Sequence, residues 1–210
     1  MPDKDLRKHW NSVYVKSPIN KLGWYEEVPE PSLRLIEKCN LNKNDSILNV
    51  GTGASILIDE LLNKGYKNII ANDLSIQALE ALKSRLKNKS NDVRWIVDDL
   101  TKPTELSKLE PIDLWHDRAV LHFFTDLDEQ DAYFELIKKL LKPGGFVIIA
   151  AFNFHSAEKC SGLPLHRYDI SMLQSKLGKD FELQESFDHT YTMPSGDTRE
   201  YIYSLFKNNC

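Results

Sequence analysis

The sequence predicts an α/β fold: a doubly wound sheet of seven strands, mostly parallel, with one antiparallel strand from a C-terminal hairpin. Two observations predict it. Short apolar runs alternate with helical apolar patterns over residues 46–151, which is typical of parallel strands joined by right-handed crossovers. Near the C-terminus two strand patterns instead follow each other around Pro-Ser-Gly at 194–196, and that order favours a hairpin.

The chain is expected to begin with helices. Apolar side chains at helical spacing predict a short amphipathic helix: Leu6, Trp10, Val13 and Tyr14. Residues 16–30 contain two prolines and a glycine, so we expect an ordered loop there. Pro31 and Ser32 begin a second helix, because proline is well tolerated in the first helical turn.

Five parallel strands are expected next, each a short apolar run: residues 46–50, 68–72, 93–97, 112–116 and 145–151. Helices are predicted between them, capped near Ser75 and near Asp126 or Asp128, and residues 143–145 (Pro-Gly-Gly) end the last of these helices. Residues 101–109 are expected to be irregular or a short helix. A further helix begins at Asp169, and strands at 181–187 and 198–206 flank a loop of about ten residues.

Composition sets limits on function. A chain of 210 residues with 41% apolar and 28% charged residues fits one globular domain. The net charge of −4 argues against a nucleic-acid partner, which usually meets a basic face. Residues 1–5 are charged and the longest apolar run, 146–152, is short, so neither a signal peptide nor a membrane span is expected. The three cysteines are widely spaced without CxxC, which disfavours disulfides and metal and favours the cytoplasm.

A glycine turn at the end of the first strand is the strongest functional signal. Gly51 and Gly53 follow an apolar run, and Asp73 ends the next strand about twenty positions later. Glycines permit a sharp turn and close approach of a ligand, and an acid at this distance meets ribose hydroxyls. Position 56 is Ile where a dinucleotide site has its third glycine, so a single-nucleoside cofactor is favoured over NAD.

Four landmarks in this order carry a family resemblance: residues 49–55, Asp73, residues 97–100 (Val-Asp-Asp-Leu) and residues 141–146 (Leu-Lys-Pro-Gly-Gly-Phe). On these the chain resembles the class I S-adenosylmethionine-dependent methyltransferases, over residues 6–207. The resemblance implies a Rossmann-like fold, an enzyme, the cofactor S-adenosylmethionine and its product S-adenosylhomocysteine. It also implies that Asp99 accepts from the adenine amino group, with Leu100 near the ring.

The resemblance assigns further residues to the cofactor. The family commonly has Asp or Glu where this chain has Asn49, so the charge that attracts the cofactor's ammonium group is missing. An aromatic lid is expected from Trp10, Trp24 and Tyr25, whose faces can stabilise a sulfonium. The expected cofactor-binding set is Trp10, Trp24, Tyr25, Asn49, Gly51, Thr52, Gly53, Asp73, Leu74, Asp99, Leu100 and His116.

The segment 115–121 is similar to a Trp-Asp-Arg-Gly-x-Leu segment of thiopurine methyltransferases, with His116 added, and protein-lysine methyltransferases carry a related Asp-Lys-Gly. Asp117 and Arg118 are therefore the expected catalytic residues near the transferable methyl. The competing interpretation is a structural ion pair at a strand end. His122 is interpreted as a core or cap histidine, and Cys160 as non-catalytic because no base accompanies it.

We expect one methyltransferase domain over residues 1–210: a helical lid segment (1–45), a cofactor-binding core (46–151) and a C-terminal helix and hairpin bordering the substrate (152–210). The expected reaction is methyl transfer to a small-molecule acceptor by in-line displacement. Three alternatives stay open: a protein-lysine methyltransferase, a nicotinamide dehydrogenase and a non-catalytic nucleoside-binding module. The acceptor and the oligomeric state are left open.

Overall fold

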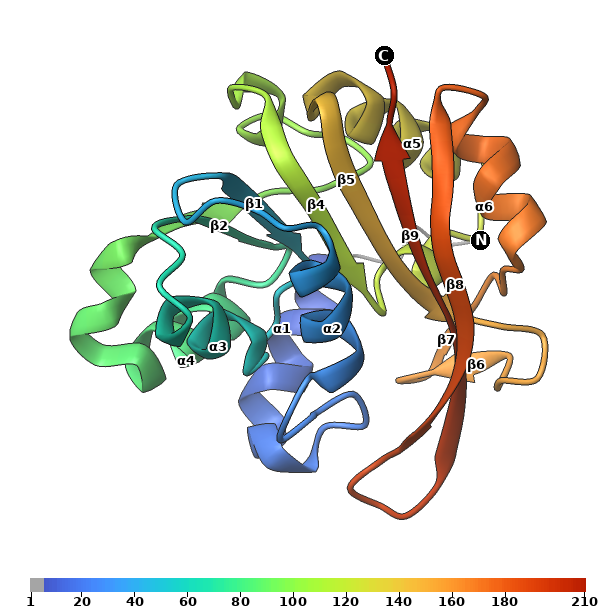
Figure 1. Cartoon of the computed structure of the whole chain (residues 1–210). Coiled ribbons are helices and arrows are strands. Elements are labelled where there is room, and N and C mark those ends of the chain that lie inside the picture. The colour runs from blue at the N-terminus through green and yellow to red at the C-terminus, as the bar shows by residue number, and fades with distance from the viewer. Residues whose placement is uncertain (1–5) are drawn as a thin grey trace.

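A computed structural model describes residues 6–210, so the charged start of the chain, residues 1–5, lies outside the described residues. The centre is a seven-stranded sheet in the order β3-β2-β1-β4-β5-β9-β8 (Figure 1). Its strands are β1 (Ser46–Val50), β2 (Asn68–Asp73), β3 (Val93–Val97), β4 (Ile112–Arg118), β5 (Leu141–Phe152), β8 (Phe181–Thr192) and β9 (Thr198–Asn208). β9 runs antiparallel to both β5 and β8, while β1 to β5 are parallel. The predicted fold class is confirmed.

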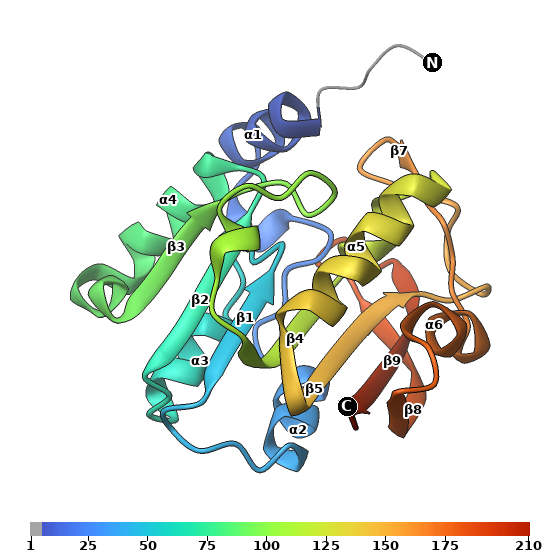
Figure 2. The same ribbon diagram turned by 90° about the horizontal axis from the view of Figure 1, so that it is seen from above.

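Helices cover both faces of the sheet (Figures 1 and 2). They are α1 (Leu6–Lys16), α2 (Glu30–Lys38), α3 (Leu57–Asn63), α4 (Ile76–Leu86), α5 (Leu127–Leu140) and α6 (Ile170–Leu177). One apolar core joins α2, α3 and α4 to the sheet, and a second joins α5 and α6 to the opposite face. The cap expected at Ser75 is present, and Asp169, where a helix was expected to begin, also caps its helix; each side chain accepts from the amide three residues later.

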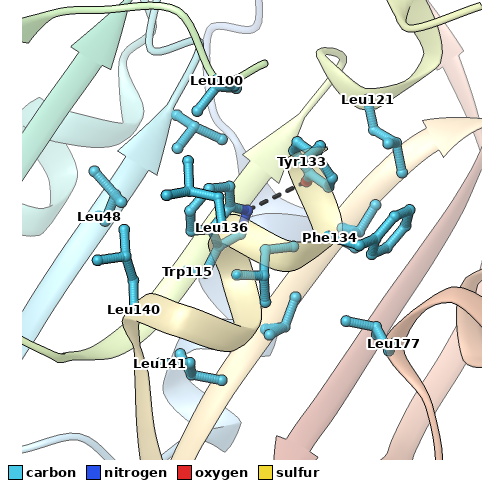
Figure 3. Packing of buried hydrophobic residues seen from close by; sticks show 14 of the residues in the cluster. Leu48, Leu100, Trp115, Leu121, Tyr133, Phe134, Leu136, Leu140, Leu141 and Leu177 are labelled. Atoms are coloured by element: carbon cyan, nitrogen blue, oxygen red, sulfur yellow. Dashed lines mark hydrogen bonds between the residues drawn. The ribbon is translucent and has the colours of Figure 1, made fainter. Parts of the chain in front are cut away.

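The core between α5 and the sheet contains a polar contact that reaches toward the site. Trp115 of β4 is fully buried and its Nε1 donates to the Tyr133 hydroxyl on α5 at 3.2 Å (Figure 3). The two rings meet edge to face at 5.5 Å. The Tyr133 hydroxyl in turn donates to Asp117 at 2.6 Å, so each of these buried polar groups has a partner.

Several boundaries differ from the sequence prediction. α5 passes directly into β5 at Leu141, so residues 143–145 lie inside a strand rather than in a separate stop. β8 continues to Thr192, beyond the predicted end at Phe187, and the hairpin loop is shorter than predicted. The outer half of β8 was not predicted as a strand because many of its side chains are exposed and polar. It is extended because its backbone pairs with β9.

A two-stranded ribbon, β6 (Lys159–Cys160) with β7 (Leu163–Pro164), was not predicted. It turns at Ser161 and Gly162, both of which have positive φ. Within residues 6–210 no helix is long and apolar enough to cross a membrane. The same part of the chain holds no group of His, Cys, Asp or Glu arranged for a metal.

Candidate active site

A cavity of about 430 Å³ lies at the carboxyl ends of the parallel strands, beside α1. This is the edge at which doubly wound sheets bind ligands. Seven of the predicted cofactor-binding residues line it: Trp10, Trp24, Gly51, Asp73, Leu74, Asp99 and Leu100. A smaller cavity of about 40 Å³ continues beside it and is lined by Trp24, Tyr25, Asn49, Gly51, Thr52 and His116.

The glycine turn after β1 has the conformation that its sequence predicts. Gly51 and Gly53 have φ of 53° and 57°, in the left-handed region where side chains are strained. A Cβ on Gly51 would overlap Val120, and one on Gly53 would overlap the Tyr14 hydroxyl. Both glycines are therefore needed for close packing within the chain, with Val120 beside Gly51 and Tyr14 of α1 beside Gly53.

Asp73 links the glycine turn to the start of α4. Its two carboxylate oxygens accept from the amides of Gly53 at 2.8 Å and Ser75 at 2.7 Å. Burial raises the pKa of Asp73 to about 6, although these amides favour the charged form. The amide of Leu74 also favours the charged form, and the carboxylate lines the cavity, where it can accept from a ligand.

The loop after β3 is shaped by two consecutive acids. Asp98 accepts from the amides of Thr104 and Leu106, both at 2.9 Å, and these bonds lower its pKa overall although burial alone would raise it. Asp99 lines the cavity, and its Oδ1 accepts from the amide and the hydroxyl of Thr101, both at 2.8 Å. Asp98 therefore holds the loop, and both acids line the cavity.

Asn49 belongs to a buried polar chain that crosses from β1 to α2. Its Nδ2 lies 2.8 Å from His116 Nδ1, and His116 Nε2 lies 2.9 Å from the Ser32 hydroxyl. Because Nδ1 accepts from Asn49, the ring proton sits on Nε2 and Ser32 accepts it. Burial, followed by the charge of Arg118, lowers the pKa of His116 to about 3, so the ring is neutral.

One buried atom of the Asn49–His116–Ser32 hydrogen-bond chain has no hydrogen-bond partner among the described residues. Asn49 Oδ1 is buried and accepts no hydrogen bond from any group in residues 6–210. It belongs to the side chain that lines the smaller cavity, next to the glycine turn. An orphaned acceptor beside the glycine turn fits a ligand with an ammonium donor, such as the amino-acid part of S-adenosylmethionine.

Comparison with known proteins shows that the chain is similar to methyltransferases. Residues 47–145 match a family described as a methyltransferase domain. EEF1A lysine methyltransferase 2 of Danio rerio is 25% identical over 162 residues, which cover 70% of this chain and 69% of that protein. The structure of N-methyltransferase NodS from Bradyrhizobium japonicum WM9 in complex with S-adenosylhomocysteine has a TM-score of 0.72 and 16% identity over 95% of this chain and 98% of that one.

A SAM-dependent methyltransferase from Anabaena variabilis is similar in structure, with a TM-score of 0.75 and 13% identity over 97% of this chain and 93% of that chain. These matches support the predicted resemblance to the class I S-adenosylmethionine-dependent methyltransferases. The match to a methyltransferase domain supports S-adenosylmethionine as the cofactor over the nicotinamide and non-catalytic alternatives.

In the methyltransferase, Asp117 does not line either cavity. Its buried carboxylate accepts from the Tyr133 hydroxyl at 2.6 Å and from the amides of Val120 and Leu121 at 3.0 and 3.1 Å. Burial raises its pKa to about 7 against the effect of these bonds. The carboxylate thus holds the turn that follows β4, and with it Val120 over the glycine turn.

Arg118 lines both cavities and is tied to two distant segments. Its Nε donates to the Tyr203 hydroxyl at 3.1 Å, and Nη1 donates to the carbonyl of Trp24 at 2.9 Å. Nη2 lies 3.0 Å from Glu26, and the two side chains of this ion pair are only 11% and 10% exposed. Burial alone would lower the pKa of Arg118, but the two tyrosines of β9 and Glu26 raise it, so it is a permanent cation.

The predicted lid residues lie together. Trp10 of α1 meets Trp24 edge to face at 5.6 Å, and Tyr14 meets Trp24 at 6.0 Å. Tyr25 lines only the smaller cavity, and its carbonyl accepts from the Tyr191 hydroxyl of β8. The Ser75 hydroxyl donates to Asn11 at 2.7 Å, which fixes α1 against the start of α4.

Four residues that shape the site were missed by sequence reasoning: Tyr14, Ser32, Arg85 and Val120. Arg85 of α4 donates to the carbonyls of Ala54 and Ser55 and pairs with Asp59, so it holds the loop beyond the glycine turn. Only Tyr14 carried a signal, because its apolar helical spacing was noted as part of α1. The other three act across contacts that no local pattern reveals.

Proposed function

We propose that this methyltransferase transfers the methyl group to a small-molecule acceptor by in-line displacement. The observation that carries this proposal is the size and cover of the main cavity. A volume of about 430 Å³ lies within the range of about 300–1,000 Å³ for small-ligand pockets, and α1 with Trp10 and Trp24 covers it. Cofactor and acceptor share this space, which favours a compact acceptor.

We infer the cofactor contacts from the geometry above. Asp73 accepts from the ribose hydroxyls, and Asp99 with the Leu100 amide meets the adenine. Asn49 Oδ1 accepts from the ammonium group, while His116 and Thr52 keep Asn49 in place. The complete proposed set is Trp10, Trp24, Tyr25, Asn49, Gly51, Thr52, Gly53, Asp73, Leu74, Asp99, Leu100 and His116.

The bound cofactor supplies an activated methyl group, so the chain's task is alignment and exclusion of water. Holding two reactants in the productive geometry can contribute about 7–11 kcal/mol to lowering the barrier. Asp117 acts through the turn it holds, as a positioning residue. Arg118 sits beside the reacting space and anchors the lid segment to β9, so its proposed catalytic role is to keep that space closed.

The proposed division of labour follows the chain. Residues 1–45 act as the lid segment, 46–151 bind the cofactor, and 152–210 border the acceptor within one domain. We also propose a cytoplasmic location, because Cys39, Cys160 and Cys210 are all free.

A protein-lysine acceptor is the second candidate, favoured by the 25% identity to EEF1A lysine methyltransferase 2. An aromatic pair such as Trp10 and Trp24 can hold a methylammonium group by cation–π attraction. An acidic rim would be expected around a site for a cationic side chain.

Methyl transfer from labelled S-adenosylmethionine separates the two candidates. The purified chain is incubated with a panel of small thiols, amines and carboxylates and, in parallel, with lysine-containing proteins and peptides. We expect label in a small molecule and S-adenosylhomocysteine in equal amount. Label in lysine side chains alone would overturn the small-molecule proposal. An Asp73→Ala variant serves as the control for cofactor-dependent turnover.

A further inference from the structure

The main cavity has two chemically different halves. Four carboxylates line it, and all belong to the side of β2 and β3: Asp73, Asp98, Asp99 and Glu129. Glu129 of α5 belongs to this group because its carboxylate interacts electrostatically with Asp99. The other half, beside β5 and β9, has no lining carboxylate in the described part of the chain. A cationic acceptor would therefore find no counter-ion there.

His122 presents an unpaired N–H in this second half. Its Nδ1 accepts from the amide of Phe152 at 3.2 Å, so the ring proton sits on Nε2. Nε2 is buried and finds no partner within residues 6–210, although the ring lines the cavity. Burial, followed by the charge of Arg118, lowers the pKa of His122 to about 3, which keeps the ring neutral. The neutral ring therefore has a free Nε2–H donor, which can bind an acceptor atom of a ligand.

Arg199 adds positive charge to the same half. It lies two residues before Tyr201 on β9, so both side chains leave the same face of the strand, and both line the cavity. Its Nη1 donates to its neighbour's carbonyl at 2.7 Å, while Nε is buried without a partner. Unlike Arg118, it forms no ion pair with a carboxylate among residues 6–210. It is a cation with donors left for a ligand.

Aromatic side chains line the cavity on both sides of His122 and lead towards Arg199. A continuous row of ring contacts runs from the lid to β9, with centroid distances of 5.6, 5.0, 4.7, 4.3 and 4.9 Å along Trp24, Trp10, Phe123, His122, Phe152 and Tyr201. Such a surface binds a flat ring by stacking and edge contacts. The donors at its β9 end would meet a polar group carried by that ring.

Among residues 6–210, no group that lines this half of the cavity is available to take a proton. Asp117 lies outside the cavity with its oxygens bonded, and the His122 acceptor nitrogen is used by Phe152. Burial raises the pKa of Cys160, so its thiol stays protonated. A hydroxyl or ammonium acceptor would need a base here, whereas an acceptor that is already an anion would not.

We propose that the acceptor is a small planar carboxylate whose ring lies on the aromatic row and whose carboxylate is bound by Arg199 and the His122 Nε2–H. This rests on the proposed small-molecule function. One carboxylate oxygen forms the new O–C bond to the methyl carbon as the C–S bond breaks and its electron pair stays on sulfur. The products are a neutral methyl ester and S-adenosylhomocysteine, and no proton is transferred.

Calorimetric titration of the full chain, saturated with S-adenosylhomocysteine, tests the proposal with three matched probes. Benzoate carries the anion, benzamide is its neutral counterpart and benzylamine its cationic one. We expect benzoate to bind at least tenfold more tightly than either control, with an affinity that falls as salt is raised. Equal binding of benzamide, or tighter binding of benzylamine, would overturn the proposal without any variant.

Variants then locate the contact. Arg199→Gln should weaken benzoate binding roughly 10- to 100-fold, the range for a charge-assisted hydrogen bond, while Arg199→Lys should keep part of it. Arg94→Gln removes the same charge from an exposed position on β3, and this control variant should change the affinity for benzoate less than twofold. Unchanged benzoate binding in Arg199→Gln would overturn the assignment. Failure of the wild type to bind S-adenosylhomocysteine would instead contradict the cofactor site itself.

Discussion

Replacing Asn49 by Asp tests both the cofactor site and the polar chain behind it. The change removes the Nδ2 donor and puts a carboxylate oxygen 2.8 Å from the His116 Nδ1 lone pair. His116 can respond by moving its proton to Nδ1, because the Ser32 hydroxyl can donate to Nε2 in the other tautomer. The carboxylate would then face the cofactor's ammonium group with its other oxygen, which is Asn49's orphaned position.

The expected gain follows from the change in the hydrogen bond. Hydrogen bonds to a charged group contribute about 1.5–3 kcal/mol and neutral ones about 0.5–1.5, so binding should tighten by about 1 kcal/mol, or roughly fivefold. Without the cofactor the new charge is buried, since Asn49 is only 3% exposed, and the melting temperature should fall. The variant should therefore depend more on S-adenosylmethionine for stability than the wild type does.

Titration calorimetry with S-adenosylmethionine, for wild type and Asn49→Asp with and without Ser32→Ala, measures the coupling. Ser32→Ala removes the donor that His116 needs in its new tautomer, so it should cancel the gain in the double variant. The gain should also shrink as salt rises where the site is wet. If Asn49→Asp binds more weakly at every salt concentration, or if Ser32→Ala leaves the gain intact, the reasoning is wrong.

Three further predictions concern the acids and the buried cation. Asp73→Ala should weaken S-adenosylmethionine binding by roughly 1.5–3 kcal/mol, and unchanged affinity by calorimetry would remove the ribose assignment. Arg118→Ala should leave Glu26 buried and unpaired and cost about 3–5 kcal/mol of unfolding free energy in denaturant titration, with partial rescue by Glu26→Gln; a stable but inactive variant would instead favour direct catalysis. The pKa of Asp117 is about 7 in the folded protein and about 4 in the unfolded chain, so the stability that its protonated form contributes is lost as the pH rises from about 4 to 7. Melting curves should show a smaller loss over that window in Asp117→Asn, and parallel curves would contradict the raised pKa.

The fold could be predicted because its signals are local and repeated. The alternation of apolar runs and helical patterns, the glycine turn and the caps at Ser75 and Asp169 each act within a few residues. The outer part of β8 could not be predicted, since residues such as Asp188 and Thr190 form a strand only because β9 pairs with them. Edge strands with one exposed face are polar, so their composition resembles a loop.

The site divides in the same way. Gly51, Gly53 and Asp73 could be proposed from the sequence because close backbone approach and an acid at a strand end are properties of single positions. The partners that give these residues their chemistry lie far away in sequence. Ser32 is 84 positions from His116, and Trp24 is 94 positions from Arg118. A motif can name the residue at a strand end, but packing decides where its side chain points.

Asp117 and Arg118 show what that difference means for mechanism. Their adjacent charges read as a reactive pair, yet neighbouring residues on a strand project to opposite faces. The Asp117 carboxylate bonds to Tyr133 of α5, and the Arg118 guanidinium pairs with Glu26 of the lid segment. The pair thus couples three elements around the main cavity, and the Asp117 carboxylate does not line that cavity. A transferase with such a site needs an acceptor that reaches it already able to attack, which is the demand that a bound carboxylate meets.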